Sequence, residues 1–396
     1  MERLVGVVQP YAWGSPTVIP ELLGVEPTGQ PQAELWFGAH PLAPSIAAGE
    51  PLDKIVDRDP ETVVGVASVA AFGPRLPFLL KIIAAERPLS LQAHPSRQQA
   101  EEGWAREEAA GVPRDAPHRT YRDGWPKPEV LCALRQTEAL CGFRDPGETY
   151  ALFGRLGVGR QVMALLEPLA DESVPAMERL CVVFGRLLRL ETADRPLVDG
   201  VLAAAAGLVD ADPDVQGFAR TATEIGSFYP GDPGVLAALL MNRITLRPYE
   251  ALYLPAGNLH AYLSGGGVEI MANSDNVMRG GLTPKHIDVS ELLRVVDFTP
   301  GFGGLLEPRQ EAPGVWHYPV PAPEFALWRL QLGDETVPVP APGSGRILLV
   351  TEGSVTLRSG EEELELARGE SALLTAAEKA TLAGRATVFV GAPGVS

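Results

Sequence analysis

The chain has 396 residues, of which 45% are hydrophobic and 21% charged, a composition typical of soluble globular proteins. Its formal net charge of −17 argues against a nucleic acid or an anionic membrane as a partner. The three cysteines, Cys132, Cys141 and Cys181, show no CxxC spacing, and no long apolar stretch follows the first residues. We therefore expect a cytoplasmic protein without disulfides, and its length predicts two or three domains.

Residues 1 to about 145 contain short strand-like runs, at 78–83 and 89–93, separated by proline and glycine turns. From about 147 to 242 the periodicity becomes helical. Leu180, Val183, Phe184, Leu187 and Leu188 follow the spacing of one helix face, and a second helix is predicted to begin at Asp232 with Pro233 in its first position. We expect this helical segment to cover one side of any cavity in the β domain.

Strand character returns at 244–254, and five short alternating runs follow at 346–350, 353–357, 362–366, 371–374 and 386–390. Strands this short and evenly spaced are typical of a jelly roll. From about residue 318 onward the sequence contains neither histidine nor cysteine, so we expect the last domain to be structural and any metal chemistry to belong to the first.

The segment 88–95 reads PLSLQAHP, in which Ser90, Gln92 and His94 alternate with apolar residues. This period of two predicts a half-buried strand with the polar side chains on one face. Gln92 and His94 would then point the same way, as two ligands of one metal ion must.

Three further segments are PKPEV at 126–130, LPAGNLHAYL at 254–263 and MANSDNVMRGGLTPKH at 271–286. Together with 88–95, and with YAWG at 11–14 and AELWFGAHP at 33–41, they resemble the type I mannose-6-phosphate isomerases, zinc enzymes of the cupin superfamily. The resemblance implies a mainly β fold with an α insertion, in which a helical domain is inserted into the first of two cupin or jelly-roll barrels. The predicted segments are 1–146 and 243–312 for the catalytic cupin domain, 147–242 for the helical insert, and 313–396 for a metal-free barrel.

By this resemblance one Zn²⁺ per chain would be held by Gln92, His94, Glu129 and His260. Mixed nitrogen and oxygen ligands suit a catalytic zinc that keeps room for water or substrate. A lone histidine on a strand is more often structural, but four motif segments in the expected order favour a metal site. His40, His118, His286 and His317 lack that support, and we interpret them as structural.

The resemblance also implies a small sugar phosphate as substrate, contacted by Arg279, Lys285 and Ser90. Lys81, Trp13 and Glu34 match family positions near the pocket, and Lys81, Lys127, Arg279 and Lys285 would form a basic island in an acidic protein. The bland alternatives are that Arg279 is a surface ion-pair partner and that Lys285 is a solvated cation. We interpret the glycine run 265–267 as a hairpin turn and not as a phosphate cradle.

The implied reaction interconverts mannose 6-phosphate and fructose 6-phosphate through an enediol. It needs a side chain that moves a proton between C1 and C2, and Lys127, Glu269 and Asp275 are the candidates beside the catalytic cation Arg279. Glu269 follows His260 by nine residues and is expected on the returning strand of a hairpin.

One departure from the family stands out, because relatives usually have Asn-His before Lys-Pro-Glu and this chain has Trp125-Pro126. The proton-transfer role of that histidine could be dispensable, could pass to another residue such as His118, or the activity could have drifted. An iron-dependent cupin oxygenase and a non-catalytic sugar-phosphate-binding protein are therefore alternatives, the first weakened by Gln92. We expect a monomer that binds neither nucleic acid nor membrane.

Overall fold

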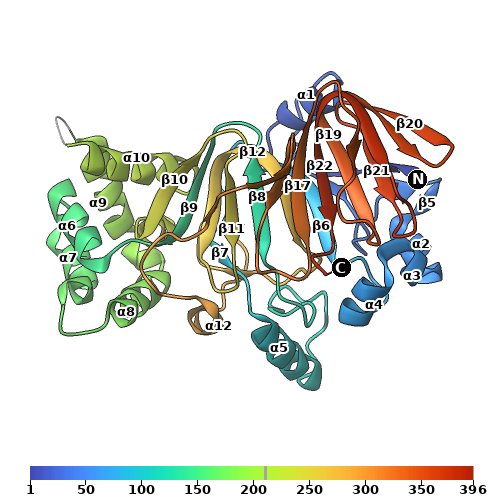
Figure 1. Ribbon diagram of the computed structural model, residues 1–396. Helices are drawn as coiled ribbons and strands as arrows, with labels where there is room; N and C mark the ends of the chain where they lie inside the picture. Colours follow the sequence, from blue (N-terminus) through green and yellow to red (C-terminus); the bar gives the residue numbers. More distant parts are fainter. Residues whose placement is uncertain (209–211, 396) are drawn as a thin grey trace.

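The computed structural model describes residues 1–208 and 212–395, which form a mainly β protein with two large antiparallel sheets and surrounding helices (Figure 1). The first, here the site sheet, has eleven strands. They are β2 (Val7–Gln9), β3 (Glu34–Phe37), β6 (Phe78–Ala85), β7 (Gln92–Ala93), β8 (Glu129–Ala133), β9 (Thr137–Phe143), β10 (Met241–Leu246), β11 (Ala251–Leu254), β12 (His260–Ala272), β13 (Met278–Arg279) and β14 (Leu305–Leu306).

The second, here the C-terminal sheet, also has eleven strands and includes three from the start of the chain. They are β1 (Glu2–Val5), β4 (Ile46–Ala47), β5 (Glu50–Pro51), β15 (Arg309–Ala312), β16 (Val315–Tyr318), β17 (Ala326–Leu332), β18 (Val337–Pro338), β19 (Arg346–Ser359), β20 (Glu362–Ala367), β21 (Ser371–Leu374) and β22 (Thr381–Ala392). β1 pairs with β21, so the first residues of the chain complete the sheet formed by the last ones. The two runs predicted at 346–350 and 353–357 form one continuous strand, β19.

Helices lie around the two sheets, and the largest group of them is the insert at one end of the molecule (Figure 1). The insert packs against the end of the site sheet with α6 (Pro146–Leu156), α7 (Arg160–Leu166), α8 (Ala176–Leu188), α9 (Arg195–Ala206), α10 (Pro213–Phe228), α11 (Gly234–Ala238) and the 3₁₀ turns Glu167–Ala170 and Thr192–Asp194. The other helices are α1 (Val18–Leu23), α2 (Leu52–Arg58), α3 (Pro60–Val64), α4 (Val66–Phe72), α5 (Arg97–Ala109) and α12 (Val289–Val295).

The predicted helix around residues 180–188 is confirmed as part of α8, whose apolar face is buried. The second predicted helix begins two residues later than expected. α11 begins at Gly234, with Pro233 in the capping position and an Asp232 side-chain oxygen accepting from the Gly234 N–H. It ends at Ala238, and Met241 already begins a strand, because β10 pairs with β9 from this residue onward.

The central strand of the site sheet is β12, and it corrects the hairpin predicted at 265–267. Those glycines lie inside β12, where its pairing changes from β9 to β8. A Cβ at Gly267 would come within 2.2 Å of the Cys132 carbonyl oxygen, and Gly265 has a φ of 106°, so side chains would prevent this close crossing. His260 and Glu269 therefore lie on one continuous strand, not on the two arms of a hairpin.

Buried side chains form separate core clusters, two of which join different parts of the molecule. One core cluster contains the inner faces of α6 to α11 together with Leu140, Phe143 and Leu259 of the site-sheet region. A second cluster lies between the two sheets and includes Phe78 on one side and Phe389 on the other. Within the described ranges, no helix is both long enough and apolar enough to cross a membrane.

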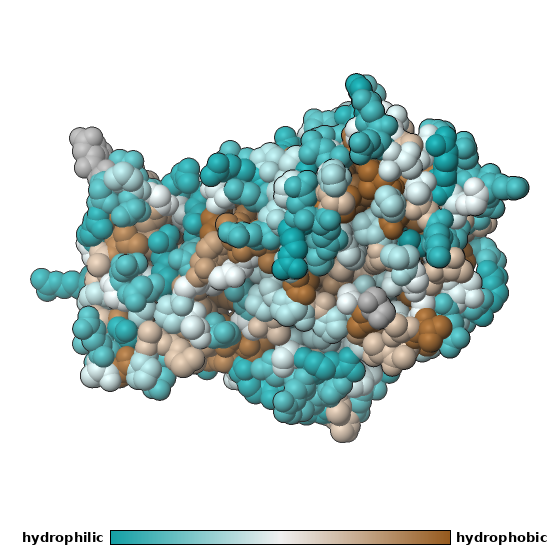
Figure 2. Space-filling model, viewed as in Figure 1, coloured by the Kyte–Doolittle hydropathy of each residue, from teal (hydrophilic) through white to brown (hydrophobic). Residues whose placement is uncertain are grey.

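The surface on the side shown in Figure 2 is largely hydrophilic, and its hydrophobic residues occur in patches separated by hydrophilic ones. The projecting helix α5 is covered by hydrophilic residues in this view. It begins with a capping box, in which the Ser96 side chain accepts from the Gln99 backbone N–H and the Gln99 side chain accepts from the Ser96 backbone N–H. This helix directly follows the predicted ligand His94 and the turn residue Pro95.

Candidate active site

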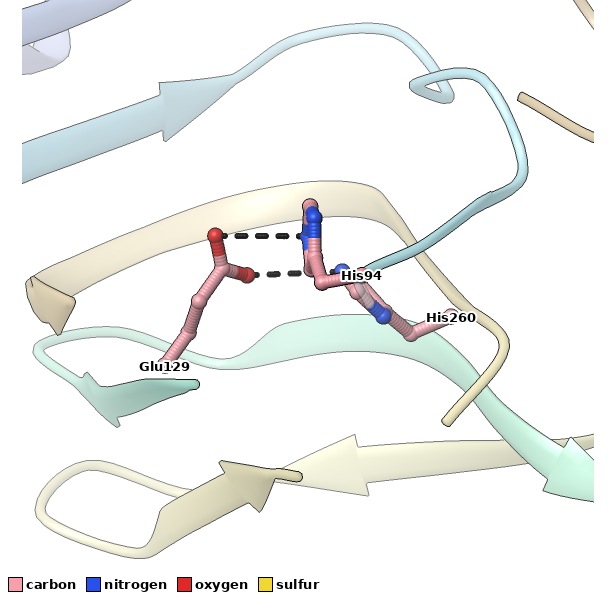
Figure 3. Close-up of side chains that lie close together, drawn as sticks. All are labelled: His94, Glu129 and His260. Atoms are coloured by element: carbon pink, nitrogen blue, oxygen red, sulfur yellow. Dashed lines mark ion pairs between the residues drawn. The ribbon is translucent and has the colours of Figure 1, made fainter. Parts of the chain in front are cut away.

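Three of the predicted metal ligands meet in the buried interior of the site-sheet region. His94 follows β7, Glu129 opens β8 and His260 opens β12. The two carboxylate oxygens of Glu129 face one imidazole each, at 3.5 Å from Nε2 of His94 and 3.4 Å from Nε2 of His260 (Figure 3). The ligand atoms of the three residues lie within 4.8 Å of one another, so they could hold a single metal ion.

The hydrogen bonds of the imidazoles fix which nitrogen is free. Nδ1 of His94 lies 2.7 Å from the carbonyl oxygen of Asn276, and Nδ1 of His260 lies 3.1 Å from that of Asn258. A carbonyl can only accept, so each Nδ1 carries the proton and each Nε2 presents a lone pair. Both Nε2 atoms are buried without a hydrogen-bond partner among the described residues, which is the arrangement a metal ion would satisfy.

The electrostatics keep His94 and Glu129 in the ionisation state that a metal requires. Burial and the charge of Lys127 lower the pKa of His94 to about 4, so its imidazole is neutral. Burial opposes ionisation of Glu129, but the Lys127 ammonium, 2.8 Å from its carboxylate, holds its pKa well below the usual value. Metal binding would therefore displace no proton from either group near neutral pH.

Gln92, the fourth predicted ligand, lies beside the cluster by strand register. It is opposite His260 on β12 and opposite Arg279 on β13, and directly opposed residues share a face of the sheet. The strand predicted at 89–93 is shorter than expected, since only Gln92 and Ala93 are hydrogen-bonded into the sheet. The predicted alternation persists around it, except that His94 is fully buried.

A cavity of about 490 Å³ lies next to the metal cluster. Nine of the thirteen predicted site residues line it: Trp13, Glu34, Lys81, Ser90, Gln92, Lys127, Asp275, Arg279 and Lys285. Glu269 and the His94–Glu129–His260 cluster lie behind this wall, buried in the sheet. The four cations expected to form a basic island are all present, against two carboxylates in the lining, Glu34 and Asp275.

Two of these cations are free to meet an anion. The side chains of Arg279 and Lys285 make no hydrogen bond or ion pair with residues 1–208 or 212–395. Burial and the nearby Arg122 lower the pKa of Arg279, and burial and Arg279 lower that of Lys285. Uncompensated repulsion of this kind is relieved when a phosphate binds between the cations.

Lys81 has a different environment, because its ammonium lies 3.3 Å from Glu34 and 3.4 Å from Glu269. Burial acts against its charge, yet the two carboxylates raise its pKa. Burial raises the pKa of Glu269, and Tyr262 donates to that carboxylate at 2.9 Å. This buried network connects the cavity wall to β12 and fixes Lys81 in place.

Several cavity residues were missed by the sequence analysis. His40, interpreted there as structural, lines the cavity, as do Tyr11, Trp36 and Tyr229. His40 lies in the quoted segment 33–41, so a signal was present, but Tyr229 follows α10 and no motif pointed to it. His118 and His286 are exposed and lie outside the lining of this cavity.

These features define a class, a mainly β protein whose sheet holds a potential mononuclear metal site beside an anion-accepting cavity. Residues 1–146 match the family model of the phosphomannose isomerase type I catalytic domain. The mannose-6-phosphate isomerases of Shigella flexneri and Escherichia coli (strain K12) are each 38% identical to the chain over 394 residues, covering 96% of this chain and 95% of theirs. The chain belongs to the type I mannose-6-phosphate isomerase family.

Solved structures agree with this assignment over the whole length. The apo form of mannose 6-phosphate isomerase from Salmonella typhimurium superposes with a TM-score of 0.90 at 36% identity, covering 99% of both chains. A mannose 6-phosphate isomerase bound with zinc and yttrium gives a TM-score of 0.89, also at 36% identity and 99% coverage. The fold and the family are therefore shared across both sheets and the helical insert.

Proposed function

We propose that this protein is a zinc-dependent aldose–ketose isomerase that interconverts mannose 6-phosphate and fructose 6-phosphate through an enediol. The observation that carries the proposal is the pair of buried, unpartnered imidazole nitrogens facing Glu129, next to a cavity with two free cations. Family membership supports the substrate, and the zinc-bound relative supports the metal.

In this proposal His94, Glu129, His260 and Gln92 hold one zinc ion, which would act as a Lewis acid on the oxygens at C1 and C2. Gln92 is neutral, so Glu129 is the one anionic ligand and the site keeps a net positive charge. That charge favours an anionic substrate and an anion-like transition state.

The chain's own residues bind and orient the sugar phosphate. Arg279 offers a planar fork of donors to the phosphate or to a developing oxyanion, and Lys285 adds a compact charge. Ser90 lines the same cavity two residues before Gln92 and is suited to contact a sugar hydroxyl. Trp13 and Glu34 are assigned to the wall that surrounds the sugar.

The proton that moves between C1 and C2 needs a carrier that touches the substrate. Of the three candidates, Lys127 and Asp275 line the cavity, whereas Glu269 lies behind Lys81. We assign the C1–C2 transfer to Lys127, which adjoins the metal cluster through Glu129, and proton exchange with sugar hydroxyls to Asp275. Glu269 then serves by fixing Lys81.

The finer architecture is part of the same proposal. We interpret each sheet as a cupin or jelly-roll barrel, with 1–146 and 243–312 as the catalytic domain, 147–242 as the helical insert and 313–396 as the metal-free barrel. Four strands are exchanged between them, since β1, β4, β5 and β15 lie within 1–146 or 243–312 but belong to the C-terminal sheet. We further propose that the protein is cytoplasmic and monomeric. Light scattering tests the monomer through the molar mass in solution.

The test is zinc content together with fructose 6-phosphate formation, measured before and after chelation. Stoichiometric zinc and turnover that chelation abolishes and zinc restores would support the proposal. His94→Ala should lose both zinc and activity, whereas the matched change of an exposed histidine, His118→Ala, should lose neither. Zinc without turnover would instead favour a sugar-phosphate-binding protein, and iron with oxygen consumption would favour an oxygenase.

A further inference from the structure

His40 lies in the wall of the cavity, three residues beyond the end of β3. It follows β3, is 3% exposed, and its Nε2 lies 3.3 Å from an Oδ1 of Asp275. With Ser274 and Asp275, it also lines an adjoining cavity of about 450 Å³, so the pair forms a partition between the two hollows. Among the described residues, His40 is the one histidine that lines either cavity.

The contacts of the imidazole fix its orientation and its tautomer. Nδ1 of His40 accepts a hydrogen bond from the backbone N–H of Leu42 at 3.2 Å, so the proton lies on Nε2. The ring also packs edge-on against Trp36, with 4.8 Å between ring centroids. His40 therefore presents a fixed N–H donor to Asp275.

Asp275 has its backbone and its side chain held by different partners. Its backbone N–H donates to Asp123 at 3.0 Å, and the preceding Ser274 hydroxyl donates to the same carboxylate at 2.9 Å. The side chain is 39% exposed, and its interaction with His40 is the contact that anchors the carboxylate in the wall. Without that contact the carboxylate could rotate away from the sugar.

We propose that His40 is the positioning residue for Asp275, holding one carboxylate oxygen so that the other is presented to the sugar hydroxyls. This inference rests on the proposed function. His40 provides an imidazole in the cavity, although Pro126 stands where relatives usually have a histidine before Lys127. His118 cannot take this role, because it is exposed and lies outside the cavity lining. His40 acts through Asp275, so its effect on turnover should vanish when Asp275 is neutralised.

The charge environment of Asp275 supports this role. Burial tends to raise the pKa of Asp275, but the hydrogen bond from His40 and the charges around it lower the pKa overall. The charged and titratable groups that act on this carboxylate are His40, Lys127, Lys81, Asp123 and Tyr11. Removing His40 should therefore raise the pKa and move the acidic limb of the kcat/KM profile to higher pH.

The experiment is a double-mutant cycle on the zinc-loaded enzyme with His40→Ala, Asp275→Asn and the double variant. We expect His40→Ala to lower kcat by about tenfold to a hundredfold, the size of a misplaced catalytic group. The double variant should be no slower than Asp275→Asn alone. If the two effects multiply, or if His40→Ala turns over like the wild type, the proposal is wrong.

A second variant separates positioning from a structural loss. His40→Gln keeps an N–H donor near the position of Nε2, so we expect it to recover activity to within about threefold of wild type, since only a hydrogen bond of ordinary strength is perturbed. Equal damage in His40→Gln and His40→Ala would overturn the positioning role. If His40→Ala does not fold, the cycle is run with His40→Gln and with zinc content and unfolding midpoint as controls. In that form, the acidic limb of His40→Gln should remain at the wild-type pH, and a limb displaced to higher pH would refute the inference.

Failure of the proposed function has a different signature. In that case the zinc-loaded wild type itself forms no fructose 6-phosphate, and this inference falls with it. If the wild type and His118→Ala turn over normally and His40→Ala does so as well, only the inference about His40 fails.

Discussion

Glu129 has the central position among the site residues, because one carboxylate faces two imidazoles and an ammonium at once. Its oxygens lie 3.5 Å and 3.4 Å from the two histidines, and Lys127 donates at 2.8 Å. A buried charge is tolerated only when it is paired and hydrogen-bonded. The Lys127 ammonium thus stabilises the ionised form of Glu129 before any metal binds. Protonated histidines are not needed for this stabilisation.

This arrangement predicts how acid affects the metal-free protein. The pKa of His94 is about 4 in the folded state, against about 6.5 in an unfolded chain, so between these values only the unfolded chain binds the proton. Folding stability is then lost as pH falls from 6.5 toward 4. Between pH 7 and pH 5, His94 should account for about 2 kcal/mol of lost unfolding free energy.

Denaturant unfolding of the metal-free wild type and of His94→Gln at the two pH values measures this difference. The glutamine variant cannot titrate, so its loss of stability between pH 7 and pH 5 should be smaller by that amount. Equal losses in the two proteins would mean that His94 is not held neutral by its surroundings.

Arg279 carries a second prediction at the residue scale. Its guanidinium is half-buried and makes no ion pair within residues 1–208 and 212–395, so its loss should leave the fold intact. We expect Arg279→Ala to lower kcat/KM by about tenfold to a hundredfold, as expected for a charge-assisted hydrogen bond of about 1.5–3 kcal/mol. Arg279→Lys keeps the positive charge but loses the forked donors, so its kcat/KM should lie between those of the wild type and Arg279→Ala. Steady-state kinetics with zinc analysis test this, and a loss of zinc in Arg279→Ala would assign the residue to the metal site instead.

At the scale of elements, the motif residues could be predicted but the strand boundaries could not. Gln92, His94, Glu129 and His260 carry their chemistry in local sequence, and the structure brings the last three together with Gln92 beside them. The glycine run 265–267 was misread because a local pattern cannot tell a hairpin from a crossing of two strands. The neighbouring carbonyl oxygens of β6, of β8 and of the β8–β9 turn show why glycine is needed there.

The helical insert was predicted to cover one side of the cavity. It contributes Tyr229 to the cavity lining. This tyrosine follows α10, lines the cavity, and donates its hydroxyl to the Pro88 carbonyl oxygen at 2.7 Å. That hydrogen bond ties the insert to the segment carrying Ser90 and Gln92. No sequence motif revealed it, because it depends on how the insert packs on the sheet.

Tyr229→Phe should therefore loosen the segment that begins at Pro88. We expect a loss of about 1 kcal/mol in unfolding free energy, the net value of one hydrogen bond. The KM for mannose 6-phosphate should rise severalfold with zinc content unchanged. Tyr150→Phe, on α6 and outside the cavity, is the matched control, and equal KM values in the two variants would remove Tyr229 from the substrate site.

At the scale of the whole molecule, the two sheets share one core, which the sequence could not reveal. The C-terminal runs were correctly predicted as strands, but their apolar faces do not indicate what they pack against. In the structure Gly391 of β22 lies against the site sheet so closely that a Cβ there would meet Ile270 at 2.9 Å and Phe78 at 3.2 Å. Tyr318 of β16 further joins the sheets by donating to the Tyr249 carbonyl oxygen at 3.0 Å.

This shared core predicts that the two sheets unfold together. Phe389 is fully buried between them, so Phe389→Ala should cost about 3–5 kcal/mol in unfolding free energy, through lost burial and the cavity left behind. Because the residue is far from the cavity lining, kcat at a temperature well below unfolding should stay within about twofold, a change worth less than 0.5 kcal/mol. Calorimetry and fluorescence should show one transition, shifted to lower temperature as a whole. Two separate transitions, of which Phe389→Ala shifts only the first, would show that the site sheet is stable alone and that the C-terminal sheet is an appended domain.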